Sequence, residues 1–91
     1  MQLLLFGTTG CHLCEQAKLS LYHYLQINKT EPIILEEIDI AEQEEWQVDY
    51  ALRIPVLFHP ETKQELGWPF DGADVQSFID GLKQSNSVHS R

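Results

Sequence analysis

The sequence predicts one α/β domain built on a four-stranded mixed sheet, in the order β-α-β and then β-β-α, with helices on both faces. An apolar strand, an amphipathic helix and a β-branched strand follow one another over residues 3–40, and a strand pair and a last helix follow over residues 55–83. With 91 residues the chain has room for one domain, because domains usually span about 100–200 residues. We expect this domain to occupy residues 1–83 and a flexible polar tail to occupy residues 84–91.

The first half of the chain predicts a strand, a helix and a second strand. Leu3–Phe6 is a short apolar run, and Ile33–Ile40 is β-branched and is expected to be a central strand. Because they are joined by a helix over His12–Ile27, the two strands should be parallel with a right-handed crossover. The apolar residues of this helix recur at spacings of three and four and predict its buried face, which comprises Leu13, Cys14, Ala17, Leu21, Tyr24 and Leu25.

A short acidic helix is expected from about Glu42 to Leu52. Trp46, Val48 and Leu52 are expected to pack it onto the sheet. Residues 31–50 contain eight acidic residues and no basic one. Such charge runs usually face water, and a docking surface for a basic partner is the alternative interpretation.

The second half of the chain predicts a hairpin and a helix. Pro55 begins a third strand over residues 56–58, a turn follows over residues 60–63, and a returning strand over residues 64–67. Asp71 is the expected N-cap of the last helix, with Asp74 in its first turn. The apolar stripe of this helix comprises Val75, Phe78, Ile79 and Leu82.

Charge and composition exclude several classes of partner. The chain has 6 basic and 14 acidic residues, a formal net charge of −8, so phosphate backbones and anionic membranes should repel it. We therefore expect no nucleic-acid or membrane partner. No targeting segment or apolar run of membrane-spanning length is visible, which predicts a cytoplasmic protein. A monomer is expected.

Cys11-His12-Leu13-Cys14 is the feature most specific for function. It follows the first strand of a β-α-β unit and opens a helix, a context that favours a redox dithiol. A structural metal site usually needs four ligands in two separated groups, and the chain has one cysteine pair and no paired histidines at ligand spacing, so we expect no bound metal. His12 is expected to be exposed and to tune the local charge when it is protonated.

The position of the two cysteines predicts their roles. The thiolate is the reactive form, and the start of a helix lowers the pKa of a thiol from about 8.5 by about one unit. Cys11 stands at this start, although the net charge of −8 acts in the opposite direction. Cys14 lies one turn further on and points back towards it. Cys11 is therefore the expected nucleophile and Cys14 the resolving thiol.

Arg53, Ile54 and Pro55 form the second segment of interest. Most X-Pro bonds in folded proteins are trans, so the residues alone favour a trans Pro55 at the start of a strand. Arg53 is either a solvated side chain or a cation that supports the thiolate or an anionic substrate. Trp68-Pro69-Phe70 either turns the chain over the core or forms an aromatic wall beside the dithiol.

Four segments resemble the glutaredoxin branch of the thioredoxin-like fold, and most closely the small glutaredoxin-like proteins of bacteria and organelles. The resemblance covers residues 2–83 and is carried by Gly10–Cys14, Ile38–Ile40, Arg53–Leu57 and Trp68–Phe70. It implies a thiol-disulfide oxidoreductase without a bound cofactor, acting on a disulfide-containing protein or glutathione. It also implies that Pro55 is cis and faces the dithiol, and that Arg53, Ile54 and Pro55 bind substrate, with the Ile54 backbone pairing with an extended peptide or glutathione.

Two departures from this family pattern concern glutathione. Glutaredoxins that use glutathione usually carry a lysine just before the dithiol and a Gly-Gly pair at the start of the last helix, and both bind carboxylates of glutathione. In this sequence Gly7–Gly10 contains no lysine, and Phe70–Asp74 stands in place of the Gly-Gly pair. Two lost contacts of about 1.5–3 kcal/mol each should weaken glutathione binding well over tenfold. Electrons are expected from glutathione or from a dithiol reductase. A binding module with incidental thiols and a metal or iron–sulfur carrier remain as alternatives.

Overall fold

The expected order of elements is present in the computed structural model, which describes residues 1–29 and 32–89, with side chains up to residue 83. The elements are β1 (Gln2–Gly7), α1 (His12–Ile27), β2 (Ile34–Asp39), the short 3₁₀ helix η1 (Ile40–Glu42), α2 (Glu44–Tyr50), β3 (Val56–His59), β4 (Gln64–Gly67) and α3 (Gly72–His89). Among the helices in the described ranges, none combines the length and the apolar character needed to cross a membrane.

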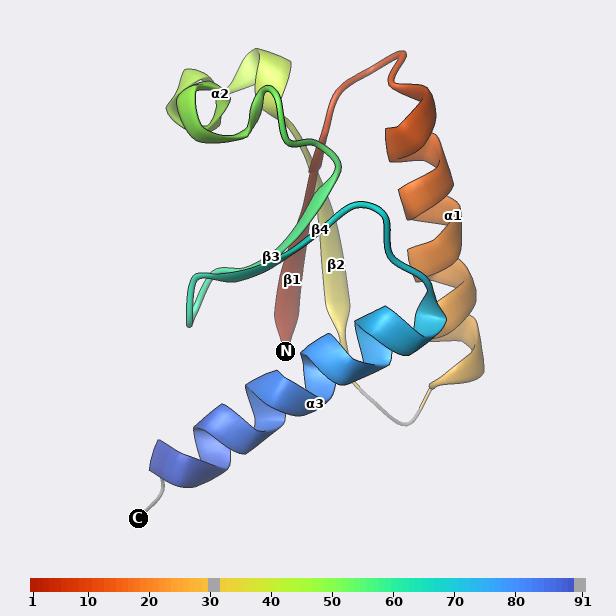
Figure 1. The fold of residues 1–91 in the computed structure, drawn as a ribbon, viewed down its shortest axis with the longest axis vertical. Coiled ribbons are helices and arrows are strands. Elements are labelled where there is room, and N and C mark those ends of the chain that lie inside the picture. The colour runs from red at the N-terminus through yellow and green to blue at the C-terminus, as the bar shows by residue number, and fades with distance from the viewer. Residues whose placement is uncertain (30–31, 90–91) are drawn as a thin grey trace.

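The four strands form one mixed sheet in the order β2-β1-β3-β4 (Figure 1). β1 pairs with β2 in parallel and with β3 antiparallel, and β3 pairs antiparallel with β4. β2 is therefore an edge strand, and the expectation that it is central was wrong. Its β-branched residues suit either position, but Ile34, Glu36 and Glu37 are exposed, as an edge strand permits.

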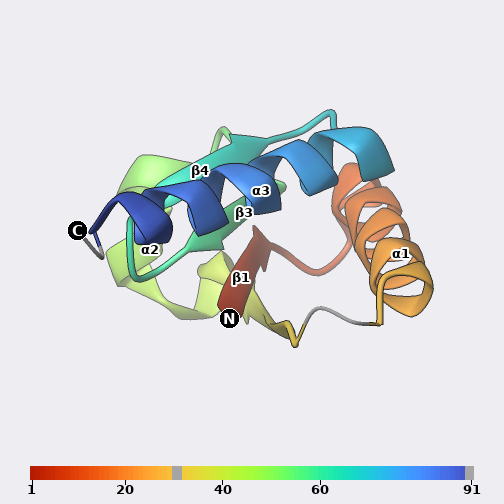
Figure 2. The same cartoon turned by 90° about the horizontal axis from the view of Figure 1, so that it is seen from below.

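Alternating residues of β1 supply the two cores of the domain, because successive side chains of a strand point to opposite faces. Leu3 and Leu5 pack with α1 and α3, whereas Leu4 and Phe6 pack with η1 and α2. The helices thus cover both faces of the sheet, as expected. The start of α3 lies beside α1 in both views (Figures 1 and 2), where the Tyr24 hydroxyl donates to Gln76 over 2.9 Å.

Phe6 is the centre of the aromatic core on the α2 side. Its ring centroid lies 4.8 Å from that of Trp46, 4.6 Å from Tyr50 and 5.3 Å from Phe58. Trp46 packs as expected, but Val48 and Leu52 are 91% and 100% exposed, so their predicted burial was wrong. The reason is geometric: Trp46 and Tyr50, four residues apart, occupy the inward face of α2, and Val48 lies between them in sequence on the outer face.

The start of α3 is capped as predicted. The Asp74 N–H donates to Asp71 Oδ1 over 2.9 Å, and the Asp71 N–H donates to Asp74 Oδ2 over 3.0 Å. The hydrogen bond from the Asp74 amide holds the pKa of Asp71 below its usual value. The α3 backbone continues to His89, further than expected. Residues 90–91 and the side chains from residue 84 onward lie outside the described part, so the flexibility of the tail stays a prediction.

Phe6→Ala should lower the free energy of unfolding by about 3–5 kcal/mol, because it removes the fully buried ring that the other aromatic residues surround. Urea-induced unfolding measures this loss. Val48→Ala is the matched control on α2 and should change stability by less than about 0.5 kcal/mol. An equally large loss in the control would contradict the outward orientation of Val48.

Candidate active site

Cys11 is the N-cap of α1. Its backbone is extended, with φ −81° and ψ 112°, and its Sγ accepts the Cys14 N–H over 3.2 Å. Gly10, at φ +83°, takes the left-handed backbone conformation that makes this turn, and the Cys11 N–H donates to the Thr8 carbonyl over 3.3 Å. The first N–H groups of a helix have no partner within it, so a sulfur at this point is stabilised as an anion.

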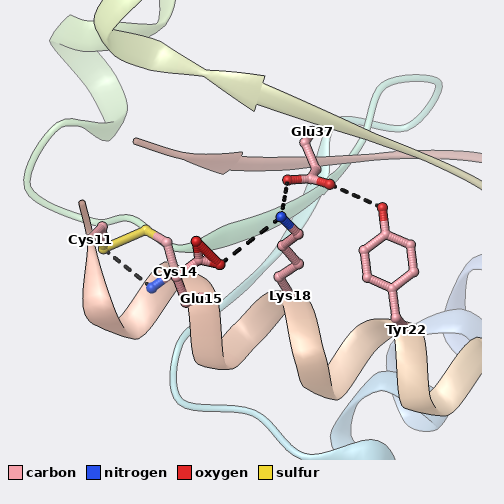
Figure 3. Close-up of polar contacts among 6 residues, drawn as sticks. All are labelled: Cys11, Cys14, Glu15, Lys18, Tyr22 and Glu37. Atoms are coloured by element: carbon pink, nitrogen blue, oxygen red, sulfur yellow. Dashed lines mark hydrogen bonds and ion pairs between the residues drawn. A yellow bond between two sulfur atoms is a disulfide. The ribbon is translucent and has the colours of Figure 1, made fainter. Parts of the chain in front are cut away.

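The two cysteines differ in exposure. Cys11 is half-buried, whereas Cys14, one turn further along α1, is only 8% exposed. The structure joins them as a disulfide with the Cα atoms 5.2 Å apart (Figure 3). Cys11 is therefore the more exposed residue of the pair.

Gly7, the last residue of β1, lies against Cys14. A Cβ added at Gly7 would lie 3.2 Å from Cys14 Sγ and 3.3 Å from Cys14 Cβ, closer than nearly all side chains approach. Phe6 pairs with Val56, the first residue of β3, in the antiparallel register. Gly7 follows Phe6 and Pro55 precedes Val56, so Pro55 lies at the same end of this strand pair as Gly7.

The Ile54–Pro55 peptide bond is cis, as the family resemblance implied and contrary to the trans bond that the residues alone favoured. Pro55 is buried, and its carbonyl oxygen accepts the Trp68 N–H over 3.2 Å. Trp68 thus lies beside Pro55, at the end of β4, and its ring packs edge-on against Phe70 at 5.1 Å. The Trp68–Pro69 bond is also cis, for which the sequence carried no expectation.

Arg53 is held by partners outside the dithiol. Its guanidinium forms an ion pair with Glu65 on β4 and lies 4.8 Å above the ring of Tyr50. The Tyr50 hydroxyl donates to the other oxygen of Glu65 over 2.7 Å. The Arg53 side chain is 49% exposed, in keeping with the solvated interpretation, although its guanidinium is paired. Support of the thiolate or of an anionic substrate by Arg53 stays a prediction. The Arg53–Glu65–Tyr50 cluster ties α2 and the segment before Pro55 to β4.

The first turn of α1 is exposed. His12 faces solvent, as expected, but Leu13 is 47% exposed, so its predicted place on the buried face was wrong. The buried stripe starts at Cys14 and continues through Ala17, Leu21 and Tyr24. In the described part of the chain, no group of three or more His, Cys, Asp or Glu side chains is arranged to hold a metal ion.

A charged group beside Cys14 was missed by sequence reasoning. Cys14 lines a cavity of about 240 Å³ together with Lys18 of α1 and Glu37 of β2. Lys18 Nζ lies 3.3 Å from Glu37 and 4.0 Å from Glu15, and the Tyr22 hydroxyl donates to Glu37 over 3.0 Å (Figure 3). The hydrogen bond to Glu37 raises the pKa of Lys18 and also that of Tyr22.

The sequence could have indicated part of this charged group beside Cys14. Cys14, Lys18 and Tyr22 are spaced four residues apart and must share one side of α1. The pairing with Glu37 depends on the placement of β2 beside α1, which no local pattern encodes.

Gly7→Val should destabilise the protein by about 1–3 kcal/mol, because its side chain would overlap Cys14. Thermal unfolding measures this loss, and a redox titration should show a shifted midpoint for the cysteine pair. Gly67→Ala is the control, since an added Cβ there meets nothing within 4 Å. If Gly7→Val left both quantities unchanged, the close approach to Cys14 would be wrong.

Tyr50→Phe should cost about 1 kcal/mol through loss of its hydrogen bond to Glu65. Glu65→Gln should also destabilise, and the double variant should lose less than the sum of the two, because both residues belong to one cluster. Chemical denaturation of the four proteins measures the coupling. Strict additivity would show that the two side chains act independently.

Comparison with known proteins gives one family and several similar structures. The family model for the glutaredoxin-like domain (DUF836) matches residues 2–80. The solved structure of target protein XcR50 from X. campestris is 30% identical, with a TM-score of 0.72 over 87% of this chain and 96% of its own. Protein Ne2328 from Nitrosomonas europaea is 32% identical, with a TM-score of 0.68 over 85% and 88%.

Thioredoxin 1 from the thermophilic eubacterium Thermosipho africanus TCF52B is a more distant structural match. It is 13% identical, with a TM-score of 0.61 over 100% of both chains, and so supports the fold alone. A search of the curated proteins gives no match. The family match extends over most of the chain and confirms the resemblance drawn from its motifs. The protein therefore belongs to the glutaredoxin-like domain family and has the thioredoxin-like fold.

Proposed function

We propose that the protein is a thiol-disulfide oxidoreductase with Cys11 as nucleophile and Cys14 as resolving thiol. The observation that supports this most strongly is the setting of Cys11, a partly exposed residue at the N-cap of α1 whose Sγ accepts the Cys14 N–H. This position lowers the pKa of a thiol by favouring its thiolate. The buried Cys14, already within bonding distance, suits the second step.

The reaction is a two-electron exchange between the reduced protein and a substrate disulfide. The Cys11 thiolate attacks one substrate sulfur, the substrate S–S bond breaks, and the departing sulfur takes up a proton. Cys14, losing its proton, then attacks Cys11 Sγ and displaces the second substrate thiol. The protein ends as the Cys11–Cys14 disulfide and the substrate as two thiols. An external thiol, glutathione or a dithiol reductase, returns the electrons.

We assign substrate binding to the segment that leads into β3. Ile54 and Pro55 adjoin the strand end that contacts Cys14, which is where a substrate disulfide must lie. The Ile54 N–H already donates to the Tyr50 carbonyl over 3.1 Å, so the Ile54 carbonyl is the proposed acceptor for a substrate N–H. Arg53, paired with Glu65, would contribute by holding this segment in place.

Disulfide-containing proteins are the proposed substrates, in preference to glutathione. The amides of Asp71 and Asp74 at the start of α3 are occupied by each other's carboxylates, so they offer no free donors to a glutathione carboxylate. Lys18, the basic residue on α1, pairs with Glu37 and Glu15. We further propose that the protein works as a monomer in the cytoplasm, where thiols are kept reduced, and that it needs no bound cofactor.

Equilibration of the reduced protein in glutathione buffers of graded potential tests this function. Intact mass should show a reversible loss of two hydrogens at a definite midpoint. Cys14→Ser should accumulate a mixed disulfide with a substrate, and Cys11→Ser should form none, because it lacks the attacking sulfur. Absence of oxidation at every potential would refute the oxidoreductase assignment, and an adduct in Cys11→Ser alone would reverse the two roles.

A further inference from the structure

The outer face of α2 combines exposed apolar and acidic side chains. Within α2, Glu44 and Val48 are four residues apart on the side away from Trp46 and Tyr50, and Glu45 and Asp49 form the adjacent row. Leu52 follows in the turn after α2. We call these five residues the α2 outer face. Val48 is 91% exposed and Leu52 is 100% exposed, so this face places two apolar side chains in solvent beside its carboxylates.

The carboxylates of this face have no ion-pair partner among the described residues. Glu44, Glu45 and Asp49 are exposed, and no ion pair or hydrogen bond engages their carboxylates in the described part of the chain. By contrast, Glu37 and Glu65 each pair with a basic side chain. Arg53, which pairs with Glu65, also donates to the Asp49 carbonyl over 3.4 Å, so one cation lies at the end of this face. The α2 outer face therefore presents three unpaired carboxylates and this single cation around two apolar side chains.

This face continues into the candidate active site. Leu52 precedes Ile54 by two residues, and Pro55 follows at the end of the β1–β3 pair where Gly7 lies against Cys14. Figure 1 shows α2 and the start of α1 at the same end of the sheet, with the segment that leads into β3 between them. A protein large enough to bring a disulfide to Cys11 could also contact the α2 outer face, whereas a small thiol would not reach that far.

We propose that the α2 outer face is a docking surface for protein substrates that carry lysine or arginine side chains around an apolar residue near the reactive disulfide. This inference rests on the proposed oxidoreductase function and names the substrate class. Val48 and Leu52 supply the apolar contact, and Glu44, Glu45 and Asp49 supply the charge complementarity. Such charges mainly raise the rate of association with an oppositely charged partner, an effect that salt screens.

Two synthetic peptides test the proposal. Each carries the same intramolecular disulfide with a leucine beside it, flanked by lysines in one peptide and by glutamates in the other. The wild-type protein should reduce the lysine peptide with a kcat/KM about tenfold higher at low salt, mainly through a lower KM. The preference should fall to about twofold or less in 0.5 M salt, where the screening length is only a few ångströms.

Variants assign the preference to this face. E44Q/E45Q/D49N should remove most of the preference, and Leu52→Ser should raise KM for both peptides with little change in kcat. E36Q/E61Q/D80N is the matched control, because it removes the same charge from exposed residues elsewhere and should keep the preference. Thermal unfolding checks that each variant is folded, and the salt dependence of the wild-type protein tests the charge effect without any variant.

The outcomes separate the two proposals. If the wild-type protein reduces neither peptide, the oxidoreductase function is wrong. If it reduces both peptides equally well at low salt, the function stands and the docking surface is refuted. Loss of the preference in the control variant to the same extent as in E44Q/E45Q/D49N would also refute the docking surface, because the effect would then follow net charge alone.

Discussion

The pairing of β1 with β3 sets the geometry on which the candidate site depends. With Phe6 opposite Val56, Gly7 and Pro55 lie at the same end of the strand pair, and Gly7 lies against Cys14 at the start of α1. The same pairing places Phe6 within the aromatic core that positions α2. A slip of one residue would turn Leu3 and Leu5 to the wrong face and move Pro55 away from the cysteines. Core packing and site geometry therefore both depend on the register of the β1–β3 pair.

Much of this arrangement could be predicted from the sequence, because local patterns encode it. The spacing of Cys11 and Cys14, the helix from His12 and the paired aspartates of α3 are contained within a few residues each. The edge position of β2 was missed because β-branched residues suit both central and edge strands. The predicted burial of Val48 and Leu52 was wrong for a related reason. Apolar character shows that a residue can be buried, but it does not show which face of a short helix such as α2 points inward. That face is set by which side chains of the helix meet the sheet.

The candidate site itself was only partly visible in the sequence, since its parts come from distant segments. The dithiol motif is local, but the partners of Arg53 and Lys18 are Glu65 and Glu37, each on a different strand. In this acidic chain, both of these basic side chains are paired with carboxylates that the fold brings to them. The helix start at Cys11 supplies positive potential for a thiolate from the backbone alone.

The cap of α3 has a consequence for how selectivity responds to acid. The Asp71 and Asp74 carboxylates occupy each other's amides at this helix start, and the bond to the Asp74 amide depends on an ionised Asp71. The pKa of the Asp71 carboxylate lies below the usual value for an aspartate. The cap is therefore complete at any pH above the usual aspartate pKa, and it is lost only as the pH falls through the lowered pKa of Asp71. Mild acidification, of the kind that protonates histidine, leaves the donors closed. The proposed preference for protein disulfides over small anionic thiols should therefore not vary with pH across the range found in living cells.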